Sequence, residues 1–94
     1  DHGLVKVKKD DILWLKAEGN YTGVYTTNKR YLIRGNLKEI KGKLGASFFR
    51  IHRSFCIRLD KIDVIRPDVV IINETEIPVG KSYRSELQNH IQTM

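Results

Sequence analysis

The chain has 94 residues, a mass of 10.9 kDa and a net charge of +6, from 17 Lys and Arg against 11 Asp and Glu. This length predicts one small domain, and a composition that is 40% hydrophobic and 30% charged excludes a disordered chain. No apolar run exceeds four residues. Roughly 20 are needed to cross a bilayer, so we expect no membrane segment in this domain.

The first third of the chain shows the period-2 alternation and the turn signals of short β-strands. Turns are expected at Lys9–Asp11 and at Glu18-Gly19-Asn20, and Asn28-Lys29 is expected at the tip of a hairpin. The predicted strands between these turns are 4–8, 12–16, 21–27 and 30–34.

The period of the hydrophobic pattern changes after Gly35. Leu37, Ile40 and Leu44 recur at i, i+3 and i+7, which predicts a short internal helix. Asn36 directly precedes this pattern and is a suitable N-cap, because its side-chain oxygen can accept from the first turn of the helix.

Extended patterns resume after this helix, and the chain ends in a second helical pattern. The predicted strands are 48–51, 54–59, 62–65, 69–73 and 76–79. Tyr83, Leu87 and Ile91 share one face of a helix expected at 82–94, with Ser82 as its N-cap. We therefore expect a mainly β domain of about ten short strands, one short internal helix and a C-terminal helix.

The positive charge is concentrated in the middle of the chain. Residues 28–61 contain ten basic residues and two acidic ones, a net charge of +8, between flanking segments that are nearly neutral or acidic. Such a concentration attracts a polyanion, either nucleic acid or an anionic membrane. The alternative is a solvated surface that keeps the domain in solution.

The densest polar cluster is Arg50-Ile51-His52-Arg53-Ser54. The planar guanidinium of an Arg suits phosphate oxygens or the acceptors of guanine, and a bend at His52-Arg53 would aim Arg53 outward. For His52 we favour an imidazole that ties neighbouring backbone together. His52 and Ser54 lack the third orienting group of a hydrolase, and the other two histidines show no metal-ligand spacing. We therefore expect no catalytic residues, no bound metal and no cofactor.

Two further segments can contact nucleic acid. Asn20-Tyr21 lies at a turn that enters a strand, where an Asn can read adenine and a Tyr hydroxyl can reach phosphate. Equally, Asn20 can serve the turn and Tyr21 the core. Residues 80–84 open the terminal helix with two cations beside backbone N–H groups, a suitable phosphate position or an ordinary helix start.

Taken together and in this order, these segments resemble the LytTR family of bacterial DNA-binding domains. The resemblance extends from about Leu4 to Ile91, and its most specific part is the Phe-Arg-Ile-His-Arg-Ser run at 49–54. The other matching segments are 12–21, 36–40, 61–62, 77–79 and 81–84. This sequence has Gly80 where the family often has Ser, and Arg58 where it commonly has Asn.

The resemblance implies an elongated stack of β-sheets, a β-β-β sandwich, whose loops enter successive major grooves at direct repeats in promoters. It further implies that residues 1–94 form one domain excised from a longer cytoplasmic response regulator, in which an N-terminal receiver or other regulatory domain precedes it. The implied base-reading residues are Asn20, Arg53 and Lys81. The implied phosphate-binding residues are Tyr21, Arg50, His52, Ser54, Ser82 and Arg84.

Two other functions remain open for the residues themselves. A small β-domain that binds single-stranded nucleic acid or RNA would display stacked aromatic rings, which Tyr21, Tyr25 and Tyr31 could supply from one face. A protein-interaction module would instead use an exposed strand edge. The single cysteine, Cys56, excludes an internal disulfide and fits a small core residue, with redox sensing as the alternative.

Overall fold

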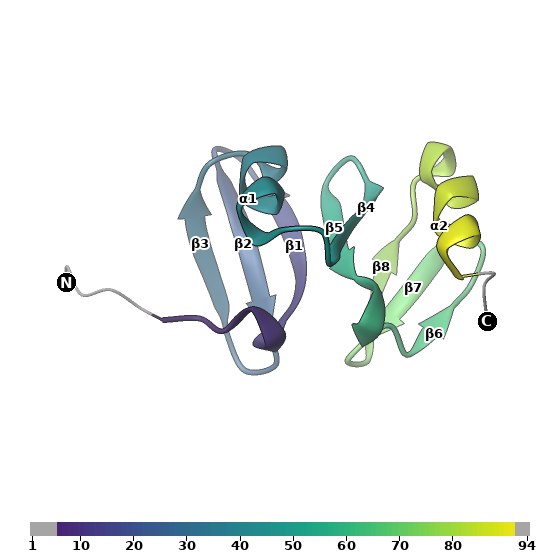
Figure 1. The fold of residues 1–94 in the computed structure, drawn as a ribbon, viewed down its shortest axis with the longest axis horizontal. Helices are drawn as coiled ribbons and strands as arrows, with labels where there is room; N and C mark the ends of the chain where they lie inside the picture. Colours follow the sequence, from purple (N-terminus) through teal and green to yellow (C-terminus); the bar gives the residue numbers. More distant parts are fainter. Residues whose placement is uncertain (1–5, 92–94) are drawn as a thin grey trace.

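The computed structural model describes residues 6–91, which form an elongated molecule of 44 × 22 × 21 Å (Figure 1). Three groups of strands follow one another along the long axis. The first contains β1–β3 with α1, the second β4 and β5, and the third β6–β8 with α2. The predicted mainly β class and elongated stack are confirmed.

The larger sheet has five antiparallel strands in the order β3-β2-β1-β5-β4. Their bounds are Ile12–Glu18 for β1, Tyr21–Thr26 for β2, Arg30–Arg34 for β3, Phe48–His52 for β4 and Phe55–Arg58 for β5. The register of β4 against β5 shifts between Arg50 and His52. Such a bulge bends a strand and re-aims the residues that follow it.

The smaller sheet has three strands in the order β6-β7-β8, with bounds Val64–Ile65, Val69–Ile72 and Thr75–Pro78. Eight strands therefore lie within residues 6–91, against the expected total of about ten. Of the predicted strand at 4–8, residues 4 and 5 lie outside the described residues, and Lys6–Lys8 join no sheet. Only Val7 of this segment packs against a core, whereas Lys6 and Lys8 are exposed, so the segment contributes one side chain to the packing without adding a strand.

The internal helix α1 spans Leu37–Leu44 and starts as expected at Asn36. The Asn36 side chain accepts from the Glu39 backbone N–H at 2.9 Å, and the Glu39 carboxylate accepts from the Asn36 N–H at 3.0 Å. This reciprocal capping box satisfies two backbone donors that the first turn would leave free. Short 3₁₀ helices stand at Lys9–Asp11 (η1), Leu59–Lys61 (η2) and Lys81–Tyr83 (η3).

The terminal helix α2 spans Arg84–Ile91, so the expected start at Ser82 is wrong, and residues 92–94 of the expected helix lie outside the described residues. Lys81–Tyr83 instead form the 3₁₀ turn η3, closed by the Tyr83 N–H donating to the Gly80 carbonyl at 2.9 Å. No side chain caps η3, because the residue before it is Gly80 and the expected cap, Ser82, lies inside the 3₁₀ turn.

Two hydrophobic cores lie on opposite sides of β1. One contains Leu13 and Trp14 with residues from β4, β5, β7, β8 and α2, and the other contains Ile12 and Leu15 with residues from β2, α1, β4 and β5. All four of these β1 residues are buried. A strand covered on both faces needs a continuous apolar run, which explains why alternation is weak there.

Candidate nucleic-acid interface

The three loops singled out in the sequence lie along one long edge of the molecule (Figure 1). They are the β1–β2 turn at 19–20, the β4–β5 loop at 53–54 and the segment 80–84 that leads into α2. We call this edge, formed by residues 19–21, 52–54 and 80–84, the loop edge. The three loops follow one another along the long axis, one from each group of strands.

Backbone hydrogen bonds join the β4–β5 hairpin to β1 on one side and to the third loop on the other. The N–H of Ala17, the second-last residue of β1, donates to the Ser54 carbonyl at 2.8 Å. The Gly80 N–H donates to the Ile51 carbonyl at 2.6 Å. The spacing of the three loops is therefore set by rigid backbone contacts, which suits the recognition of a ligand with a fixed repeat.

In the first loop, Gly19 has φ +65°, which favours glycine, and Asn20 and Tyr21 are exposed. The Asn20 carbonyl accepts from the Gly35 N–H at 3.0 Å, so the turn between β3 and α1 lies beside this loop. Of the two interpretations of Tyr21, the packed one is wrong. Tyr21 is 40% exposed and stands at the first position of β2, beside the turn.

Arg34 lies over the Tyr21 ring, with 5.8 Å between the guanidinium carbon and the ring centroid. The two residues are partners in the β2–β3 register. The sequence motifs did not single out Arg34 or the exposed Lys38 in the first turn of α1. The hairpin register was the available signal for Arg34, because it pairs the first residue of β2 with the last of β3.

The acidic residue nearest the first loop is paired within the protein. The Glu18 carboxylate lies 2.7 Å from Nη1 of Arg30 and accepts from the Tyr25 hydroxyl at 2.8 Å. Burial, together with this hydrogen bond to Glu18, raises the pKa of Tyr25 above its ordinary value. The charge of Glu18 is therefore partly neutralised by Arg30, which leaves the carboxylate of Glu39, bound to the Asn36 N–H, as the other acidic group beside this loop.

Three hydrogen bonds hold the second loop. Nε of Arg50 donates to the His52 carbonyl at 2.9 Å, and Nη2 of Arg50 donates to the Arg53 carbonyl. The Ser54 N–H donates to Nδ1 of His52 at 3.0 Å, which confirms that the imidazole ties neighbouring backbone together. Because Nδ1 accepts, the neutral ring carries its proton on Nε2. Arg53 is exposed, in agreement with the expected bend.

The third loop exposes Lys81, Ser82 and Arg84. Gly80 packs closely at its start, since a Cβ there would lie 3.0 Å from Cδ2 of Tyr83 and 3.5 Å from Cα of His52. The second and third loops are therefore in direct contact, and this glycine allows the approach.

Of the three tyrosines expected to share a face, only two do so. Tyr21 and Tyr25 lie on one face of β2, whereas Tyr31 is opposite Val24 and packs against the other core. The Tyr25 ring stacks on Trp14, with 5.0 Å between centroids and 17° between planes. The register of β3 against β2 thus separates the rings, and no three-ring platform forms in this sheet.

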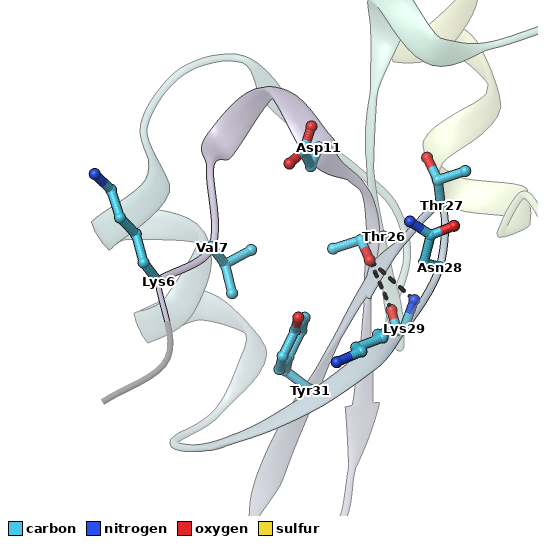
Figure 2. Close-up of a pocket in the computed structure, with 8 residues that line it drawn as sticks. All are labelled: Lys6, Val7, Asp11, Thr26, Thr27, Asn28, Lys29 and Tyr31. Atoms are coloured by element: carbon cyan, nitrogen blue, oxygen red, sulfur yellow. Dashed lines mark hydrogen bonds between the residues drawn. The ribbon is translucent and has the colours of Figure 1, made fainter. Parts of the chain in front are cut away.

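A cavity of about 430 Å³ lies by the β2–β3 hairpin, whose tip is at the edge opposite the loop edge (Figures 1 and 2). Figure 2 shows Lys29 and Tyr31 pointing into it and Lys6 pointing away. The Thr26 hydroxyl on its wall bonds to both the N–H and the carbonyl of Lys29. The cavity includes no residue of the three loops.

Within residues 6–91, no three His, Cys, Asp or Glu side chains gather closely enough to hold a metal ion. No helix in the same part of the chain has the length and apolar character required to cross a membrane.

Comparison with known proteins gives concordant results. Residues 2–92 match the model of the LytTr DNA-binding domain family. The chain is 34% identical over 96 residues to the transcriptional regulatory protein YpdB of Escherichia coli, covering 94% of this chain and 39% of that protein. It is 34% identical over 94 residues to the sensory transduction protein LytR of Streptococcus agalactiae, with coverages of 93% and 38%.

A solved structure has the same fold. It is the LytTr DNA-binding domain of a methyl-accepting/DNA response regulator from Bacillus cereus, with a TM-score of 0.86 and 27% identity. The match covers 96% of this chain and 89% of that one. The chain spans about two fifths of the length of the curated relatives named above.

Proposed function

Because the chain belongs to the LytTr DNA-binding domain family, we propose that it binds a specific sequence of double-stranded DNA through its loop edge. The observation that carries this proposal is the arrangement of the three loops along one side of the molecule (Figure 1). Loops in a row, joined by backbone hydrogen bonds, can reach one face of a duplex together.

The size of the molecule supports contact with successive major grooves. Its long axis measures 44 Å, and one turn of B-DNA is about 34 Å long. The molecule is therefore longer than one turn of the duplex, and the three loops follow one another along this axis (Figure 1). Each loop is short, and a short loop can present one or two side chains to base edges in a groove about 12 Å wide.

The exposed side chains support two groups of contacts, one with the bases and one with the phosphates. We propose Asn20, Arg53 and Lys81 as base readers, one from each loop, since all three are exposed. Phosphate contacts would come from Tyr21, from Nε2–H of His52, and from Ser54, Ser82 and Arg84. We propose Arg34 and Lys38 as further phosphate contacts, because both are exposed near the first loop. The expected phosphate contact of Arg50 competes with the two loop carbonyls that it already binds.

The relatives suggest the setting in which this binding operates. Their names describe a transcriptional regulatory protein and a sensory transduction protein, and this chain spans only 39% and 38% of their lengths. We propose that the chain is the single DNA-binding output domain of a cytoplasmic response regulator, controlled by a receiver or other regulatory domain. Its targets would be direct repeats in promoters.

Selection of bound duplexes from a random pool tests the proposal. We expect one enriched motif for the wild type. Arg53→Ala should weaken binding to that motif by about 1–3 kcal/mol, with a much smaller effect on random DNA, because a base contact is lost. Arg66→Ala is the matched control, since Arg66 is an exposed arginine in the turn between β6 and β7. Absence of an enriched motif would refute sequence-specific binding.

A further inference from the structure

We propose that Arg50 is a positioning residue, which holds the β4–β5 loop in the shape that presents Arg53 to DNA. This inference rests on the proposed DNA-reading function and assigns Arg50 a task other than phosphate binding. It begins from the partners of the Arg50 side chain, which are two backbone carbonyls of the loop itself.

The need for such a residue arises from the bulge at the end of β4. The ladder with β5 shifts register between Arg50 and His52, so the backbone there leaves the regular pairing. Carbonyls outside a ladder need other donors. Arg50 supplies them from the same strand, through Nε to the His52 carbonyl at 2.9 Å and through Nη2 to the Arg53 carbonyl.

These two bonds set the direction of the reading side chain. The Arg53 carbonyl is held by Arg50, while the adjacent Ser54 is held on its other side by His52 and by Ala17. The backbone on both sides of the exposed Arg53 side chain is therefore fixed. Preorganisation of this kind lowers the entropy lost when a side chain docks against a base.

Arg50 is also linked to the third loop. Its neighbour Ile51 is completely buried, and the Ile51 carbonyl accepts from the Gly80 N–H at 2.6 Å. A change in the bulge would therefore move the start of the segment that contains Lys81. Lysine cannot replace arginine in this task, because one ammonium does not reproduce the fork that spans two carbonyls.

The first test needs no DNA and follows amide hydrogen exchange at Ser54 by NMR in Arg50→Lys and Arg50→Gln. We expect exchange at this amide to rise about ten-fold or more in both variants, with the Val70 and Ile72 amides of β7 as internal references. Arg66→Gln is the control for loss of one exposed charge. Unchanged exchange at Ser54 would overturn the positioning role even if DNA binding is specific.

The second test measures affinity for the selected duplex and for a scrambled duplex over a range of salt. Both Arg50 variants should lower the ratio of the two affinities by roughly ten-fold and leave the salt slope unchanged. A phosphate contact predicts something different: Arg50→Gln would reduce the slope by about 0.9 and weaken both duplexes equally, with Arg50→Lys close to wild type. That result would refute the inference. Arg84→Gln shows how loss of a phosphate contact appears in the same assay.

The two tests separate failure of this inference from failure of the proposed function. If no duplex is selected by the wild type, sequence-specific binding fails. The exchange measurement still decides whether Arg50 holds the loop. If a duplex is selected and Ser54 exchange rises but the affinity ratio stays at its wild-type value, loop order has no part in reading and the positioning role is refuted.

Discussion

Cys56 lies in the core between β1, α1 and β4, and its side chain has no exposed surface. Burial raises the pKa of its thiol from 9.0 to about 11, and the positive charges of Arg50 and Lys41 oppose this shift only in part. The thiolate is the form that reacts with oxidants, so a buried and protonated thiol favours a packing role over redox sensing.

The raised pKa of Cys56 predicts a loss of stability in alkaline solution. The unfolded thiol ionises near pH 9 and the folded one near pH 11, so its contribution is complete below pH 9 and is lost as the pH rises through 11. Between these two pH values the free energy of unfolding should fall by about 1.4 kcal/mol per pH unit, or roughly 2–3 kcal/mol in total. Urea unfolding at several pH values between 8 and 11 measures this loss of stability.

Cys56→Ala is the reference for this measurement, because all other titrating groups, including Tyr25, remain in both proteins. The wild type should lose more stability than the variant across this range. Parallel curves for the two proteins would show that the thiol does not remain protonated in the fold.

At the scale of elements, α1 shows how local sequence can specify a helix start. Asn36 and Glu39 form their reciprocal bonds within four residues, so the capping box needs no tertiary contact. The helix has only eight residues and buries Leu37 and Ile40 against the sheet. A helix this short depends on both its cap and its packing.

Loss of the cap should therefore be measurable. Asn36→Ala removes the acceptor for the Glu39 N–H and should lower the free energy of unfolding by about 0.5–2 kcal/mol. Asn28→Ala in the exposed β2–β3 hairpin is the matched control, expected to change stability by less than about 0.5 kcal/mol. Chemical denaturation compares them, and equal effects would mean that packing alone holds α1.

The terminal helix α2 and the bulge in β4 show what local pattern misses. The backbone bond from Tyr83 to Gly80 replaces the expected Ser82 cap, and it forms where Gly80 packs against the β4–β5 loop. The bulge likewise has no sequence signature of its own. It follows from the pairing of β4 with β5, which brings residues from two strands into one register.

At the scale of the whole molecule, charge is distributed unequally between the two long edges. The loop edge exposes Arg53, Lys81 and Arg84, and Glu18 beside it is paired with Arg30. The opposite edge contains η1, η2 and the β7–β8 turn, where acidic and basic residues are mixed (Figure 1). The acidic residues of these three segments are Asp10, Asp11, Asp60 and Glu74.

This unequal distribution of charge predicts that the affinity for DNA falls steeply as the salt concentration rises. The three cations proposed to contact phosphate, Arg34, Lys38 and Arg84, would give a slope of about −3 in a plot of log affinity against log salt, and a loss of roughly forty- to sixty-fold between 50 and 200 mM. Fluorescence anisotropy with a labelled duplex measures the slope. A single-stranded oligonucleotide should compete poorly at the same salt, because the tyrosines do not form a stacking platform.

The results of these binding measurements distinguish duplex binding from the two other functions that the residues left open. Binding that survives high salt would favour a protein-interaction module, and stronger competition by single strands than by duplexes would favour a single-strand binder. Either result would contradict the proposed role of the loop edge.

The amino-acid sequence by itself determined most of the elements, the cap at Asn36 and the three segments that form the loop edge. These features depend on residues close together in the chain, where periodicity, turn residues and motifs are informative. The resemblance carried by residues 49–54 and the matching segments was enough to predict the family.

The tertiary structure alone decided which side chains are free and which are engaged. Arg34 meets Tyr21, Tyr31 is separated from Tyr25, and Arg50 turns back to its own loop. Each of these outcomes depends on strand register or on a bulge, because a shift of one residue moves every side chain to the other face. Register is set by pairing between distant segments, so no local pattern contains it.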